Sequence, residues 1–280
     1  MLPSFLLSLR EGVEAALIVG IVLGVLKKMG RMDRAPRVWL GVAGAAAISV
    51  VGAIVLNFAG TKLEGPGEQV FEGLTMLAAA GVLTWMIFWM QKQGRRIQSG
   101  LEAEVRSALT RQQDWALFSV AFFAVVREGL ELALFLTAAN FSTLVTGADG
   151  PIAGWLGGLL GLVAAAIVGW LLFNTTVKLN LRRFFQLTSA VLIVFAAGLV
   201  GLAIHEFNEL GWIPSIVEHI YDVNHIIPDK ADVGLFLKAL FGYNGNPSLT
   251  ETISYLGYFV VIYLMARWLD RRPVAGPTAA

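Results

Sequence analysis

The chain of 280 residues contains no cysteine, and only 15% of its residues are charged. Without cysteine, disulfides, thiolate metal sites and a cysteine nucleophile are all excluded. A soluble domain carries about 25% charged residues, whereas 56% of this chain is hydrophobic, so an ordinary soluble fold is excluded as well. The formal net charge of +1 provides no basic surface for nucleic acid. We therefore expect no nucleic-acid partner.

Long apolar runs show where the chain meets a lipid bilayer, whose core of about 30 Å needs about 20 helical residues. Four runs contain no Asp, Glu, Lys or Arg: residues 38–61, 73–91, 150–177 and 184–204. A shorter run covers residues 252–266, and two further stretches, residues 3–26 and 115–141, are interrupted by charged clusters. We predict an all-α integral membrane protein with seven transmembrane helices.

The distribution of cations predicts the orientation in the membrane. The first stretch is not a cleaved signal peptide, because it lacks a basic start and carries Arg10, Glu11 and Glu14 within its apolar region. Lys and Arg gather in alternate loops, at residues 27–37, 92–111, 178–183 and 271–272. Since short cytoplasmic loops are rich in cations, we place the N-terminus outside and the C-terminus in the cytoplasm of a multi-pass plasma-membrane protein, the inner membrane in a bacterium.

An internal repeat links the two halves of the chain. An offset of 117 residues places Arg10, Glu11, Gly12 and Glu14 on Arg127, Glu128, Gly129 and Glu131, Asn57 on Asn174, and Gln69 on Gln186. Each copy holds three predicted helices, an odd number, so the second copy must be inverted relative to the first. Inverted repeats are typical of secondary transporters, whose substrate sites lie near the bilayer midplane between the repeats.

The repeat divides the chain into six predicted parts. They are a first three-helix repeat at residues 1–91, an amphipathic cytoplasmic linker helix at 92–114, a second three-helix repeat at 115–208, an extracytoplasmic loop rich in acids and histidine at 209–249, a seventh helix at 250–269 and a cytoplasmic tail at 270–280. The seventh helix lies outside the repeat.

The motif Arg-Glu-Gly-x-Glu occurs once in each repeat, within an apolar helix. On a helix its two glutamates share one face, and the arginine is close enough to pair with the second glutamate four residues on. The glycine allows a neighbouring helix or a ligand to come close. A charge at mid-bilayer costs about 2.5–3.5 kcal/mol, so these side chains must face the protein interior.

The charge balance of the two motifs predicts a cation site. Four glutamates against two arginines leave a formal charge of −2, and clustered carboxylates are donors suited to hard cations. Arg10 and Arg127 have no lone pair to donate, so we assign them to ion pairs that support the site. The alternative is that both motifs are structural ion pairs that hold two helices together.

With its two motifs, Arg10-Glu11-Gly12-Val13-Glu14 and Arg127-Glu128-Gly129-Leu130-Glu131, the sequence resembles the iron/lead transporter family. That family comprises the ferric iron permeases of fungi and their bacterial EfeU-like relatives. The resemblance implies iron uptake, with Glu11, Glu14, Glu128 and Glu131 as metal ligands in the path. It implies an extracytoplasmic iron-binding or redox partner protein. Ferric iron is the expected form, although the resemblance does not fix the oxidation state.

Other polar residues extend the prediction beyond the motifs. Glu72 lies at the start of the third apolar helix, where it is either a fifth carboxylate of the path or an interfacial acid favoured by the helix dipole. Met86 and Met90 are four residues apart, a spacing that would suit copper(I) but more often belongs to a packed core.

All three histidines, His205, His219 and His225, fall in the predicted outer loop among several acids. Glu218, His219, Asp222 and His225 follow helical spacing along one side. We interpret this segment either as a solvated acidic loop or as a metal-collecting or docking site, since histidine with carboxylate suits iron or zinc.

These observations predict a permease that imports iron, with no permanent cofactor and no enzymatic activity. Two alternatives stay open. The first is a permease for another hard or divalent cation, such as manganese, zinc or lead, because carboxylates bind many hard cations. The second is a membrane-embedded redox enzyme, which the residues support poorly because no histidine or cysteine lies at mid-bilayer to bind haem or copper.

Overall fold

The computed structural model describes residues 1–63, 65–110, 114–145, 151–174, 181–228, 234, 237 and 241–270. The regular structure within these residues is entirely helical, which confirms the all-α class. The long helices are α1 (Leu2–Lys28), α2 (Ala35–Lys62), α3 (Pro66–Thr110), α4 (Asp114–Val145), α5 (Pro151–Asn174), α6 (Leu181–Glu209) and α8 (Leu249–Asp270), with a short 3-10 turn, η1 (Met32–Arg34), before α2.

Five stretches of the described chain are long and apolar enough to cross a membrane: Met32–Gly60, Pro66–Trp89, Ile152–Leu172, Arg183–Glu209 and Leu249–Trp268. The first covers η1 and most of α2, and the others lie in α3, α5, α6 and α8. The other two long helices, α1 with 27 residues and α4 with 32, are long enough but carry the charged motifs near their middle. The protein is thus built as a multi-pass membrane protein.

The outer helices present apolar side chains to their surroundings. Ile54 of α2, Leu159 of α5 and Leu256 of α8 are each about three-fifths exposed, at 60%, 60% and 58%. Exposed aliphatic faces of this extent suit contact with lipid, where the helix satisfies its own backbone hydrogen bonds. The faces that remain polar must then lie inside the bundle.

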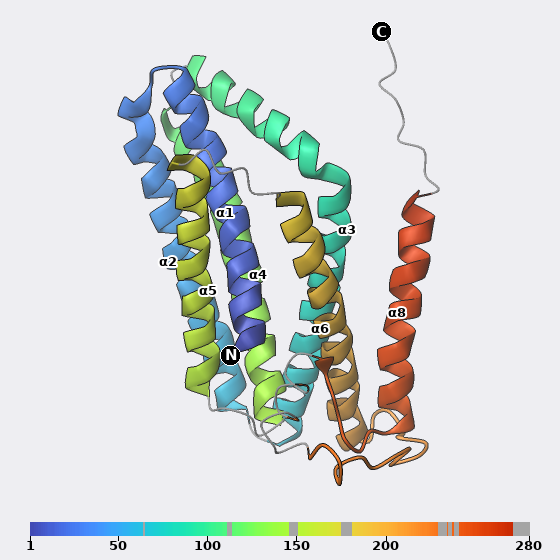
Figure 1. The fold of residues 1–280 in the computed structure, drawn as a ribbon. Coiled ribbons are helices and arrows are strands. Elements are labelled where there is room, and N and C mark those ends of the chain that lie inside the picture. The colour runs from blue at the N-terminus through green and yellow to red at the C-terminus, as the bar shows by residue number, and fades with distance from the viewer. Residues whose placement is uncertain are drawn as a thin grey trace.

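Equivalent helices of the two repeats run in opposite directions, and helices of one repeat pack mainly on helices of the other. Figure 1 shows α1 and α4 crossing the bundle in opposite senses, as do α2 and α5, and α3 and α6. α1 packs chiefly on α5, and α4 packs chiefly on α2. Each first helix of a repeat therefore packs along the second helix of the other repeat.

Glycines bring these exchanged pairs into backbone contact. A Cβ atom added at Gly41 of α2 would lie 2.6 Å from the Phe118 carbonyl oxygen of α4. A Cβ atom added at Gly161 of α5 would lie 2.9 Å from the Leu9 backbone nitrogen of α1. Such close approach is how small residues drive helix packing in membranes, where hydrophobic burial contributes little.

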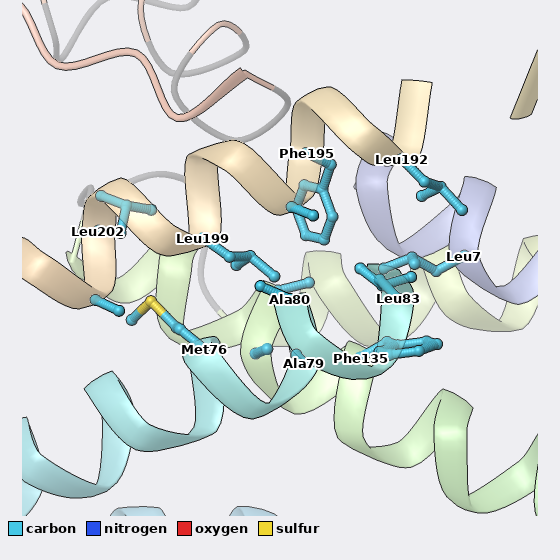
Figure 2. Close-up of a cluster of buried hydrophobic side chains, with 14 of the residues drawn as sticks. Leu7, Met76, Ala79, Ala80, Leu83, Phe135, Leu192, Phe195, Leu199 and Leu202 are labelled. Atoms are coloured by element: carbon cyan, nitrogen blue, oxygen red, sulfur yellow. The ribbon is translucent and has the colours of Figure 1, made fainter. Parts of the chain in front are cut away.

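The largest apolar core fills the space between α3 and α6 and extends to α1 and α4. Figure 2 shows Met76, Ala80 and Leu83 of α3 facing Leu192, Phe195 and Leu199 of α6. Leu7 of α1 and Phe135 of α4 complete the cluster, and both are fully buried. α8 packs mainly against α6, on the outside of this unit.

The predicted linker helix is not a separate element. α3 continues without a break from Pro66 to Thr110, 45 residues in all, so residues 92–110 extend the third membrane helix. Figure 1 shows α3 changing direction and crossing the end of the bundle where α1 ends. There Val105 and Leu109 pack on Val22 of α1, Val38 of α2 and Leu117 of α4, in a second core. Residues 111–113 lie outside the described chain.

The predicted outer loop is less regular than the spacing of its acids and histidines suggested. His205 is not a loop residue, because α6 continues to Glu209. Residues 210–228 contain no helix, so the helical arrangement expected for Glu218, His219, Asp222 and His225 is wrong. Backbone bonds to the chain just before and within α8, such as Leu249 N to Val217 O at 3.0 Å, tie this segment down without helical repetition. Most of the predicted tail, residues 271–280, lies outside the described chain.

Candidate cation site

The first motif forms a closed charged unit at the middle of α1. Arg10 lies 2.8 Å from Glu11 (Nη1 to Oε1) and 3.2 Å from Glu14 (Nη2 to Oε1). Its Nη1 also donates to the Met86 sulfur of α3, at 3.3 Å. The Arg10 side chain is fully buried, so its charge is compensated by contacts within the protein.

The second motif repeats one of these pairs at the middle of α4. Arg127 Nε donates to Glu131 Oε1 at 3.0 Å. The i, i+4 pairs expected from spacing are therefore confirmed in both motifs. The environment differs, however, because the Arg127 side chain is 33% exposed.

Three glutamates from the two motifs converge on one point. Oxygens of Glu11, Glu128 and Glu131 all lie within 4.8 Å of one another, an arrangement able to hold a metal ion. Each of the three also has a buried oxygen, Oε2, that finds no hydrogen-bond partner in the described chain. Buried carboxylate oxygens without donors are costly unless paired with a cation. The cluster therefore offers carboxylate oxygens, some of them buried without a donor, that a bound cation would satisfy.

Glu14 has a different place from the other motif glutamates. It pairs with Arg10 and is not among the three whose oxygens converge. Of the four glutamates predicted as ligands, three converge in this structure, and the fourth lies one turn away on α1.

The motif glycines contact helices rather than ligands. A Cβ atom added at Gly12 would lie 2.6 Å from Ala165 Cβ of α5, and one added at Gly129 would lie 2.6 Å from Ser49 Cβ of α2. The close approach expected of these glycines is therefore that of the exchanged helix pairs.

Apolar packing closes one side of the carboxylate cluster. Leu7 precedes Glu11 by one helical turn, and Phe135 follows Glu131 by one turn, and both are fully buried in the main core. At the pseudo-equivalent positions on the other side, Ala124 and Ile18 are only partly buried. The two sides of the cluster are therefore packed to different extents.

Glu72 and Met86 lie near other groups than the cluster. Glu72 is buried, with 7% of its surface exposed, and it interacts electrostatically with Glu206 of α6 and with Glu68. It does not belong to the three-glutamate group among the described residues. Met86 is buried against Arg10, and the side chain of Met90, its predicted partner, lies outside the described residues.

The histidines do not come together. His205 Nδ1 lies 2.9 Å from Glu251 Oε1, a contact that links α6 to α8. Its Nε2 lies 3.3 Å from Glu209 Oε1, within α6. Glu218, His219, Asp222 and His225 are all exposed on the irregular segment. They form no metal-binding group within the described chain.

Two tryptophans beside the site were missed by the sequence reasoning. Arg127 Cζ lies 4.4 Å from the Trp89 ring centroid and 5.4 Å from that of Trp85. The available signal was their spacing of four residues on the helix that also carries Met86. Spacing alone does not say which neighbour an aromatic face meets.

The sequence of the chain matches a family of known proteins. The model of the family described as "Iron permease FTR1 family" matches residues 1–270. The chain belongs to the iron permease FTR1 family. The resemblance that was drawn from the two motifs is thereby confirmed, and iron permeation is the activity for which the family is named.

Curated relatives cover the whole length of the chain. It is 35% identical to the "Ferrous iron permease EfeU" of Yersinia pestis over 282 aligned positions, covering 100% of this chain and 98% of the relative. It is 37% identical to the protein of the same name from Escherichia coli O157:H7 over 282 positions, covering 100% and 99%. No solved structure matches the chain.

Proposed function

We propose that the protein imports iron across the plasma membrane, the inner membrane in a bacterium, through the carboxylate cluster of Glu11, Glu128 and Glu131. The observation that carries the proposal is the convergence of these three side chains from two repeats, each with a buried oxygen that lacks a donor. Family membership supports iron as the cargo. Glu14 takes part as a fourth carboxylate that leaves Arg10 when the ion arrives or departs.

For the oxidation state we favour ferrous iron. The four motif glutamates and two arginines carry a formal charge of −2, which a divalent ion neutralises and a trivalent ion exceeds. The relatives are named as ferrous iron permeases. Ferric iron, the form first expected from the fungal members of the family, is the alternative that the experiment below tests.

We propose seven membrane spans, with α1 and α4 included and the N-terminus outside. Their charged motifs face the interior, so neither helix has to place them in lipid. The basic residues between α1 and α2 lie at the end of the bundle that residues 92–110, the arm of α3, cross, which fits a cytoplasmic face. The C-terminus then lies in the cytoplasm.

Cysteine labelling tests this orientation, and the absence of native cysteine makes it clean. Met32→Cys and Ile226→Cys place thiols at exposed positions, 48% and 69% exposed. In intact cells an impermeant maleimide should label Ile226→Cys alone, and both should react after the cells are opened. Labelling of Met32→Cys from outside would reverse the proposed orientation.

Iron would reach the site from an extracytoplasmic partner, an iron-binding or redox protein. The exposed acids and histidines of residues 218–225 are the proposed point of contact. The buried Glu72 of α3 and Glu206 of α6 are the proposed next step on the way to the cluster. These assignments rest on charge and position. Uptake with and without a periplasmic extract tests whether a partner is needed.

The direct test is cation uptake by the purified protein in liposomes. Fe(II) under reducing conditions, Fe(III), Mn(II), Zn(II) and Pb(II) are supplied separately, and initial rates are compared with empty liposomes. The proposal expects Fe(II) to enter fastest. Faster entry of Mn(II) or Zn(II) would favour a permease for another divalent cation, and faster entry of Fe(III) would restore the ferric prediction.

A further inference from the structure

Side chains of a single helix, α3, contact both motif arginines. On α3, Met86 contacts Arg10 through its sulfur at 3.3 Å, while Trp85 and Trp89 face the Arg127 guanidinium. These residues occupy a single turn of α3. The repeat offset places Leu202, Ala203 and Glu206 of α6 at the corresponding positions, so this arrangement does not follow from the repeat and belongs to α3 alone.

The two arginines are compensated in different ways. Arg10 lies against two carboxylates, Glu11 and Glu14. Arg127 lies against one carboxylate, Glu131, and against the Trp89 ring, whose centroid is 4.4 Å from its Cζ. Trp85 stacks on Trp89 with ring centroids 6.0 Å apart and an interplanar angle of 25°. The Arg127 guanidinium therefore lies beside a stacked pair of indole rings.

A cation at the site competes with Arg127 for Glu131. Glu131 is both the partner of Arg127 and one of the three convergent carboxylates. Guanidinium stays charged at any physiological pH, so when the ion takes Glu131 the Arg127 charge needs another partner inside the membrane. The face of tryptophan is the strongest aromatic partner for a cation, and desolvation strengthens the contact.

We propose that Trp89, backed by Trp85, is a positioning residue that holds the Arg127 guanidinium away from the carboxylate cluster while the transported cation occupies Glu131. This inference rests on the proposed function of the cluster. Without the indole, Arg127 falls back onto Glu131 and competes with the cation. The predicted consequence is weaker cation binding in an otherwise intact protein.

A double-mutant cycle tests this role. Fe(II) affinity is measured anaerobically on the purified protein for Trp89→Leu and Trp89→Phe, each with Arg127 present and in an Arg127→Ala background. With Arg127 present, Trp89→Leu should weaken Fe(II) binding about fivefold to tenfold, and Trp89→Phe should recover most of that loss. In the Arg127→Ala background, Trp89→Leu should change affinity less than twofold.

Control variants separate the proposed positioning role of Trp89 from a purely structural one. Trp170→Leu, at an exposed tryptophan of α5 (61% exposed), should leave affinity unchanged. An equal loss in both Arg127 backgrounds, or no loss in either, would overturn the proposal. If Trp89→Leu does not yield folded protein, Trp85→Leu and Trp89→Phe carry the cycle, with a smaller coupling expected. If Glu11→Gln and Glu128→Gln bind iron normally, the proposed function fails whatever the tryptophan variants do.

Discussion

The two copies of Arg-Glu-Gly-x-Glu share four residues but lie in unlike surroundings. Arg10 is fully buried between two carboxylates and a methionine, whereas Arg127 is 33% exposed and lies on two indole rings. The variable position differs as well, since Val13 is fully buried and Leu130 is 44% exposed. A repeated sequence has therefore produced two unequal sides of one site. In inverted-repeat transporters the substrate site lies between the repeats, so an ion held by this cluster would meet two differently packed halves.

The largest expected effect tests whether both copies supply ligands despite their difference. Glu11→Gln and Glu128→Gln each keep the side-chain shape but remove one negative ligand, and hard cations depend strongly on ligand charge. Each should reduce Fe(II) uptake by liposomes at least about 100-fold. Glu104→Gln, on the exposed arm of α3, is the matched control. Wild-type uptake by either motif variant would leave that copy with the role of a structural ion pair.

The arginines should differ in their contribution to stability. Arg10→Ala leaves two buried carboxylates without their partner, which costs about 3–5 kcal/mol for a buried pair. Arg127→Ala removes a partly exposed pair and should cost about 1 kcal/mol. Unfolding in detergent, followed by circular dichroism, measures both. Equal losses would mean that the difference in burial has no energetic consequence.

The two helix pairs, α1 with α5 and α2 with α4, should lose similar stability when their contact glycines are replaced, in contrast to the two motif arginines. Gly41→Ala and Gly161→Ala each push a methyl group into the backbone of the partner helix and should each destabilise by about 1–3 kcal/mol. Gly24→Ala, where nothing lies within 4 Å, should be neutral or stabilising by up to about 1 kcal/mol. A loss confined to one of the two pairs would show that the packing is not equivalent.

Much of the membrane architecture could be predicted because it depends on local properties. Charge-free runs locate the spans, and the i, i+4 geometry of a helix brings Arg10 to Glu14 and Arg127 to Glu131 wherever the helix lies. The repeat offset predicts that the two motifs lie in antiparallel helices, and Figure 1 shows α1 and α4 in that relation.

Contacts between helices could not be predicted in the same way. The convergence of Glu11 with Glu128 and Glu131, and the stacking of Trp89 on Arg127, depend on how far each helix is shifted and rotated against its neighbour. Periodicity along one helix does not contain that information. The end of α3 was misplaced for a related reason: a change from apolar to charged residues marks the membrane surface, but it does not end a helix.

Because each repeat packs its helices on those of the other repeat, the order of synthesis affects how the protein folds in the membrane. The main partner of α1 is α5, and the main partner of α2 is α4. α1 is therefore synthesised long before its main partner, which ends at Asn174. The first half has no complete interior of its own. A half-length protein with this packing would cover its interior only as two copies inserted in opposite directions. The joined chain provides both orientations in one molecule, in a one-to-one ratio.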